Sequence, residues 1–116
     1  MAKILVVDDE TAIRNLIVAV LEEEGYDAIG VASGAAALRV APTERPDLVL
    51  LDMMMPGMDG RETLCRLREY PETRSTPVIV MSAAVTAEQC GPEAAAFLPK
   101  PFDLVVLLDT IEQALA

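Results

Sequence analysis

The sequence contains no histidine, no tryptophan and only two cysteines, and its longest apolar runs are short. Without histidine the usual kind of zinc site is excluded, and Cys65 and Cys90 are better explained as reduced thiols than as a disulfide framework. The apolar runs are far too short to cross a bilayer, and no charged-then-apolar leader opens the chain. We therefore expect a cytoplasmic protein with no membrane insertion.

Basic residues are also scarce. The sequence has 9 Lys and Arg against 19 Asp and Glu, which gives a net charge of −10. Nucleic-acid binding needs a basic surface, so we predict no direct nucleic-acid binding. The only aromatic residues are two Tyr and two Phe, which disfavours a flavodoxin-like cofactor binder. With 116 residues and 53% hydrophobic content, the chain is expected to form a single domain over residues 1–116.

Short apolar runs typical of buried strands alternate with segments of helical periodicity. Strands are predicted at 3–7, 27–32, 48–51, 78–81 and 96–98, and helices at 11–24, 35–41, 61–69, from 86 to about 91, and after 103. Pro42 is expected to stop the second helix, and Gly91-Pro92 the fourth. This order predicts an α/β fold, a doubly wound five-stranded parallel sheet with right-handed crossovers.

Local signals mark the ends and inner faces of these helices. Gly25 is expected just beyond the first helix, and Ser33 and Asp103 are expected to cap the second and the last. The residues expected to face the core are Ile13, Leu16, Ile17, Val20 and Leu21 in the first helix, Leu64 and Leu67 in the third, and Val106, Leu107, Ile111 and Leu115 in the last.

Charged residues follow three of the predicted strands. Asp8 and Asp9 come after the first strand, Asp52 after the third and Lys100 after the fifth. Parallel strands bring their carboxyl ends to one edge of a sheet, where ligands bind in such folds. Two carboxylates about 4 Å apart repel by roughly 4 kcal/mol at an effective dielectric near 20, so a bound cation, the lysine or protonation must compensate. The pattern favours a hard-cation site suited to phosphoryl chemistry.

Four motifs occur in one order, each at the end of a predicted strand. They are VVDDE at 6–10, PDLVLLDMMMPGMDG at 46–60, PVIVMSA at 77–83 and LPKPF at 98–102. With these motifs the chain closely resembles, from Lys3 to Leu115, the receiver domain of two-component response regulators. The resemblance implies a flavodoxin-like sheet with the strand order 2-1-3-4-5.

The resemblance also implies a role for each residue at the site. Asp52 would accept the phosphoryl group from a phosphohistidine. Asp9, Asp52 and the backbone carbonyl of Met54 would bind Mg²⁺ directly, and Asp8 would act mainly through coordinated water. Lys100 would pair with the phosphoryl group, and a cis bond between Lys100 and Pro101 would aim it.

Two further residues would form the switch. Ser82 would bind a phosphoryl oxygen once Asp52 is modified, and Phe97 would turn inward as Ser82 moves. The implied partners are a sensor histidine kinase or a phosphotransfer protein, and a downstream effector protein or effector domain. The domain would catalyse only its own phosphorylation and dephosphorylation, so it is not expected to be an enzyme acting on other substrates.

The segment between Ser82 and Lys100 is a few residues shorter than is general in this family, so we expect a shortened or irregular fourth helix. Two alternatives stay open at this stage. A pseudo-receiver would lack phosphorylation, although it need not retain this set of acids and the lysine. A small hydrolase or mutase using an aspartyl-phosphate would need a further acid-base residue, and no second motif suggests one.

Overall fold

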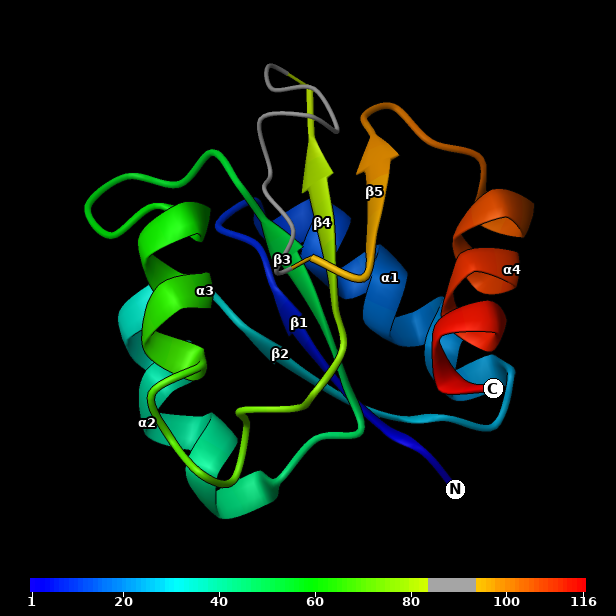
Figure 1. The fold of residues 1–116 in the computed structure, drawn as a ribbon. Helices are drawn as coiled ribbons and strands as arrows, with labels where there is room; N and C mark the ends of the chain where they lie inside the picture. Colours follow the sequence, from blue (N-terminus) through cyan, green and yellow to red (C-terminus); the bar gives the residue numbers. More distant parts are fainter. Residues whose placement is uncertain (84–93) are drawn as a thin grey trace.

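Five parallel strands form one central sheet in the computed structural model, which describes residues 1–83 and 94–116. The strands are β1 (Lys3–Val7), β2 (Asp27–Val31), β3 (Leu48–Asp52), β4 (Val78–Ser82) and β5 (Ala96–Pro99). The helices of the described residues are α1 (Thr11–Glu23), α2 (Gly34–Glu44), α3 (Gly60–Leu67) and α4 (Leu104–Leu115). Figure 1 shows α1 and α4 on one side of the sheet and α2 and α3 on the other.

The strands lie in the order β2-β1-β3-β4-β5, and all neighbouring pairs are parallel. This confirms the predicted doubly wound, flavodoxin-like fold and its strand order. In the register, Val7 lies beside Leu51, Asp52 beside Met81, and Ser82 beside Pro99. The residues that follow β1, β3, β4 and β5 are therefore brought to one edge of the sheet.

Successive residues of the central strands pack on opposite faces, as expected for strands that are covered on both sides. The face toward α2 and α3 holds Leu5, Val7, Val49, Leu51, Val78 and Val80, with Ala37, Ala41, Leu64 and Leu67 from the helices. The face toward α1 and α4 holds Ile4, Val6, Leu48, Leu50, Ile79 and Met81, with Ile17, Leu21, Leu107 and Ile111. Two cores hold the sheet rigidly between its helices.

The predicted helix boundaries are confirmed in part. Ser33 and Asp103 accept hydrogen bonds from the amides of Ala36 and Val105, and Gly25 has a φ of 91° just beyond α1. The prediction that Pro42 stops the second helix is wrong, because α2 continues to Glu44. Pro42 lies in the last turn, so the break that it makes in the hydrogen-bond pattern falls at the end of α2, with only Thr43 and Glu44 after it.

The third helix also differs from its prediction. It begins at Gly60, one residue before the predicted start, because the Asp59 side chain accepts a hydrogen bond from the Glu62 amide and caps the helix there. It ends at Leu67, two residues before the predicted end, with Arg68 as its C-cap. The expected fourth helix, from 86 to about 91, lies outside the described residues.

Two residues predicted to face the core are exposed instead. Leu16 in α1 is 52% exposed and Val106 in α4 is 49% exposed. Each directly precedes a residue that faces the sheet, Ile17 or Leu107, and neighbouring positions on a helix point about 100° apart. Within the described part of the chain, no helix has the length and apolar character needed to span a membrane.

Candidate functional site

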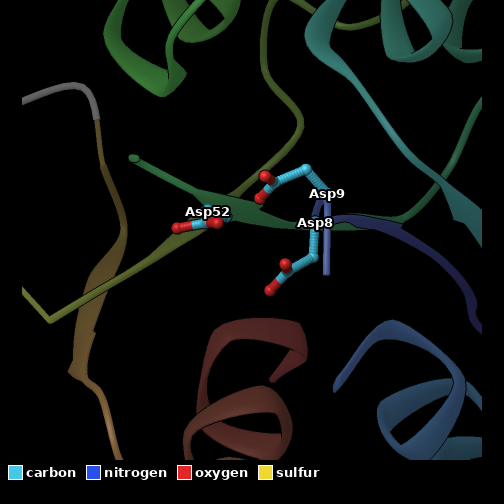
Figure 2. A group of neighbouring side chains, drawn as sticks. All are labelled: Asp8, Asp9 and Asp52. Atoms are coloured by element: carbon cyan, nitrogen blue, oxygen red, sulfur yellow. The ribbon is translucent and has the colours of Figure 1, made fainter. Parts of the chain in front are cut away.

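Three carboxylates meet where β1 and β3 end. One oxygen from each of Asp8, Asp9 and Asp52 lies within 4.8 Å of the other two. Figure 2 shows the side chains of Asp8, Asp9 and Asp52 gathered at the ends of the strands. Asp8 and Asp52 are buried and Asp9 is exposed, so the group opens to solvent on the side of Asp9. The predicted convergence of these acids is confirmed.

Protein groups fix Asp8 on every side. Its amide donates to the carbonyl of Val31 at 3.2 Å. Its Oδ1 accepts from the amide of Glu10, and its Oδ2 accepts from Lys100 Nζ, both at 2.9 Å. Because both carboxylate oxygens already accept a hydrogen bond, Asp8 is less available as a direct metal ligand than its neighbour Asp9.

Asp52 is the last residue of β3 and is 3% exposed. Burial raises the pKa of its carboxyl to about 6; the charges of Asp8 and Asp9 act in the same direction, against the Met54 amide and Lys100. The Met54 amide donates to Asp52 Oδ1 at 3.1 Å, and this contact turns the β3–α3 loop around the carboxylate. The ionised form of Asp52 therefore lowers the stability of the folded protein.

Lys100 brings a positive charge to this acidic group. Its Nζ lies 2.9 Å from Asp8 Oδ2, 3.5 Å from Asp52 Oδ2 and 3.9 Å from Glu10 Oε1. Burial alone lowers the pKa of Lys100, but the hydrogen bond with Asp8 and the charges of Asp52, Asp8 and Glu10 raise it above its ordinary value. The ammonium therefore stays charged, and the predicted cis bond between Lys100 and Pro101 is present.

Ser82 and Phe97 belong to the neighbouring strands. Ser82 is the last residue of β4 and is buried, and its carbonyl accepts a hydrogen bond from the Lys100 amide at 2.8 Å. Phe97 lies in β5 beside Val80 and packs, half-buried, against the core under α2 and α3. Ser82 thus lies at the sheet edge with Asp52 and Lys100, whereas Phe97 lies within its strand.

The donor atoms suit a hard cation. The three side chains offer only carboxylate oxygens, the ligands that Mg²⁺ and Ca²⁺ prefer, and soft ligands are not among them. The Met54 side chain is 55% exposed, so the backbone of this residue, and not its thioether, is the part held beside Asp52. The arrangement can hold a divalent ion next to a buried carboxylate and a lysine.

From the sequence, Gly60 was interpreted only as a loop residue, but in the structure Gly60 packs against the backbone of Asp52 and Met53. A Cβ on Gly60 would lie 2.5 Å from Met53 Cα and 2.7 Å from the Asp52 carbonyl oxygen. The Gly60 amide donates to the Met53 carbonyl at 3.1 Å. The first residue of α3 therefore packs directly on the backbone that carries Asp52, which its place at the end of the 46–60 motif did not reveal.

A family model described as the response regulator receiver domain matches residues 4–112. The chain belongs to the response regulator receiver family. The role of this family in two-component systems is that of a phosphorylation-activated signalling domain. Sporulation initiation phosphotransferase F of Bacillus subtilis is 41% identical over 117 aligned residues, which cover 97% of this chain and 93% of that protein.

Solved structures of receiver proteins have the same fold. Chemotaxis protein CheY4 of Vibrio cholerae is 33% identical with a TM-score of 0.93, and 98% of each chain is covered. The receiver domain of the sensor histidine kinase PA1611 from Pseudomonas aeruginosa is 28% identical with a TM-score of 0.89, over 98% of this chain and 97% of that one. The latter structure contains a magnesium ion coordinated in its active-site cleft.

The raised pKa of Asp52 predicts a pH-dependent gain of stability in metal-free Asp52→Asn. Because the folded-state pKa of about 6 lies above the ordinary 3.8, the ionised carboxylate destabilises the fold above pH 6 and not below pH 4. Urea unfolding in EDTA should show the variant more stable than the parent by up to about 3 kcal/mol at pH 7, and by much less at pH 4.

Asp109→Asn is the matched control, because it removes an exposed carboxylate from α4. This control should leave the pH profile close to that of the parent. A stability difference between Asp52→Asn and the parent that does not change with pH would contradict the crowding of charge at Asp52.

Gly60→Ala tests the close approach of α3 to β3. In a helix, replacing Gly by Ala would by itself stabilise by up to about 1 kcal/mol. Here the Cβ meets backbone atoms that cannot move without shifting Asp52, so we expect a loss of about 1–3 kcal/mol in the free energy of unfolding. A variant as stable as the parent, or more stable, would show that this contact is not a constraint.

Proposed function

We propose that residues 1–116 form a single receiver domain that takes a phosphoryl group onto Asp52. The observation that carries the proposal is the position of this buried carboxylate: one of its oxygens lies within 4.8 Å of an oxygen of both Asp8 and Asp9, and Oδ2 lies 3.5 Å from Lys100 Nζ. In the transfer the P–N bond of a partner's phosphohistidine breaks and a bond forms between phosphorus and an Asp52 oxygen. Such transfers depend mainly on alignment and charge neutralisation, which these residues supply.

Mg²⁺ is the proposed cofactor. Asp9, Asp52 and the Met54 carbonyl would hold it directly, and Asp8, whose two oxygens already accept hydrogen bonds, would act through coordinated water. When bound, the ion neutralises part of the charge on the phosphoryl oxygens. Asp8, Asp9 and Asp52 outnumber Lys100 at the end of the sheet, so the site favours a divalent cation over an empty state above pH 6.

The proposed switch uses Lys100, Ser82 and Phe97. The phosphoryl group brings about 1.5 to 2 negative charges in place of the single charge of the Asp52 carboxylate. Lys100 can then turn from Asp8 to the phosphoryl group. The Ser82 hydroxyl would donate a hydrogen bond to a phosphoryl oxygen, and Phe97 would follow by packing further inward. The signal is then a shift between two conformations of the β4 and β5 ends.

The proposed partners are a sensor histidine kinase or phosphotransfer protein that supplies the phosphoryl group, and a downstream effector protein or domain that reads the change. We place this exchange in the cytoplasm. The domain would catalyse only its own phosphorylation and dephosphorylation, because the described residues of the site pair one acceptor with charge-neutralising groups and include no separate acid-base pair for another substrate.

Incubation with acetyl phosphate and Mg²⁺, followed by intact mass spectrometry, tests the proposal. We expect one phosphoryl addition to the parent protein and none to Asp52→Asn, because the amide cannot form the acyl phosphate. Asp9→Asn should slow the reaction by at least tenfold through loss of a metal ligand.

Asp109→Asn is again the control and should be modified like the parent. A phosphoryl group that persists in Asp52→Asn would overturn the assignment of the acceptor. Phosphorylation in EDTA at the same rate as in Mg²⁺ would overturn the role of the metal.

A further inference from the structure

The side chain of Arg14 reaches from α1 to the end of β1. Its Nη1 donates to the backbone carbonyl of Asp8 at 2.9 Å. Arg14 is the fourth residue of α1, near the positive end of the helix dipole, where a cation is disfavoured. An arginine in this place, half-buried against the sheet, is accounted for by the contact that its guanidinium makes.

A glycine in β2 makes room for this arginine. A Cβ on Gly30 would lie 3.1 Å from Arg14 Cγ and 3.2 Å from Arg14 Cδ. The aliphatic part of Arg14 therefore lies against the bare backbone of β2 at the strand position beside Val6. From this position the guanidinium extends to the carbonyl of Asp8, the first residue after β1.

The Asp8 carbonyl is the one polar group of that residue whose partner comes from α1. Its amide is bound to Val31, and its carboxylate is bound to Glu10 and Lys100. The carbonyl oxygen of Asp8 and the amide nitrogen of Asp9 belong to one planar peptide unit. Fixing this oxygen fixes the plane from which the exposed Asp9 side chain projects toward Asp52.

We propose that Arg14, seated on Gly30, is a positioning residue for Asp9 as a metal ligand. The inference rests on the proposed Mg²⁺ site and adds a residue that touches neither the ion nor the phosphoryl group. Groups that orient metal ligands from outside the coordination shell typically contribute 10–100-fold to metal affinity. The charge of Arg14 acts in the opposite direction, since a cation next to the site repels Mg²⁺, so a loss of affinity on its removal reports orientation.

The test measures Mg²⁺ affinity by calorimetric titration of the intact chain at pH 7.5. We expect Arg14→Met to bind Mg²⁺ about tenfold more weakly than the parent, and Arg14→Lys to lie between the two. Val18→Ala is the matched control, because Val18 also packs from α1 on the position of Gly30. Arg66→Met removes one positive charge from the exposed face of α3. Both controls should bind as the parent does.

A second readout needs no metal. The Glu10 amide donates to Asp8 Oδ1, so its hydrogen exchange, followed by NMR in EDTA, reports the order of the Asp8–Asp9 turn. We expect exchange at least fivefold faster in Arg14→Met than in the parent. Gly30→Ala should weaken Mg²⁺ binding by displacing the arginine, and this effect should vanish in the Arg14→Met background.

Parent-like Mg²⁺ affinity in Arg14→Met would overturn the inference while leaving the proposed function intact. Weaker binding with unchanged exchange of the Glu10 amide would also overturn it, because Arg14 would then not order the turn. If the parent itself bound no Mg²⁺, the proposed function would fail, and with it the assignment of Arg14 to a metal ligand.

Discussion

The site depends on the placement of one ammonium group among carboxylates that repel one another. Lys100 reaches Asp8 at 2.9 Å and Asp52 at 3.5 Å, so β5 is tied electrostatically to β1 and β3 across the end of the sheet. Burial of Asp52 is the main cause that raises its pKa to about 6, and the charges of Asp8 and Asp9 add to it, because one lysine does not balance three acids. The folded protein thus has an excess of negative charge at the end of the sheet, which a bound divalent ion can neutralise.

This arrangement is the physical basis of the proposed switch. Lys100 contacts the acids through its side chain, while its backbone amide is bound to the carbonyl of Ser82 at 2.8 Å. Any group that draws the ammonium away from Asp8 therefore acts on a residue that also joins β4 to β5. The rigid parts, two cores on the two faces of the sheet, confine such a change to the strand ends.

Much of this was predictable from the sequence, because strands buried on both faces leave apolar runs and the site residues directly follow them. The meeting of Asp8, Asp9 and Asp52 followed from the parallel topology once the strand order, which the family resemblance supplied, placed β1 beside β3. The extension of α2 past Pro42 was not predictable, since the position of a proline within a last turn depends on where the chain leaves the helix. The roles of Arg14 and Gly60 were not predicted, because they come from close contacts with backbone atoms, which the periodicity of the sequence does not encode.

The most direct test counts the protons released when Mg²⁺ binds, by calorimetric titration in buffers of different ionisation enthalpy. If burial and the neighbouring acids hold Asp52 at a pKa of about 6 and the ion binds that same carboxylate, about half a proton should be released at pH 6 and almost none at pH 8. In Asp52→Asn the release at pH 6 should be absent. Mg²⁺ binding to the parent with no proton release at pH 6 would contradict a crowded, metal-binding Asp52.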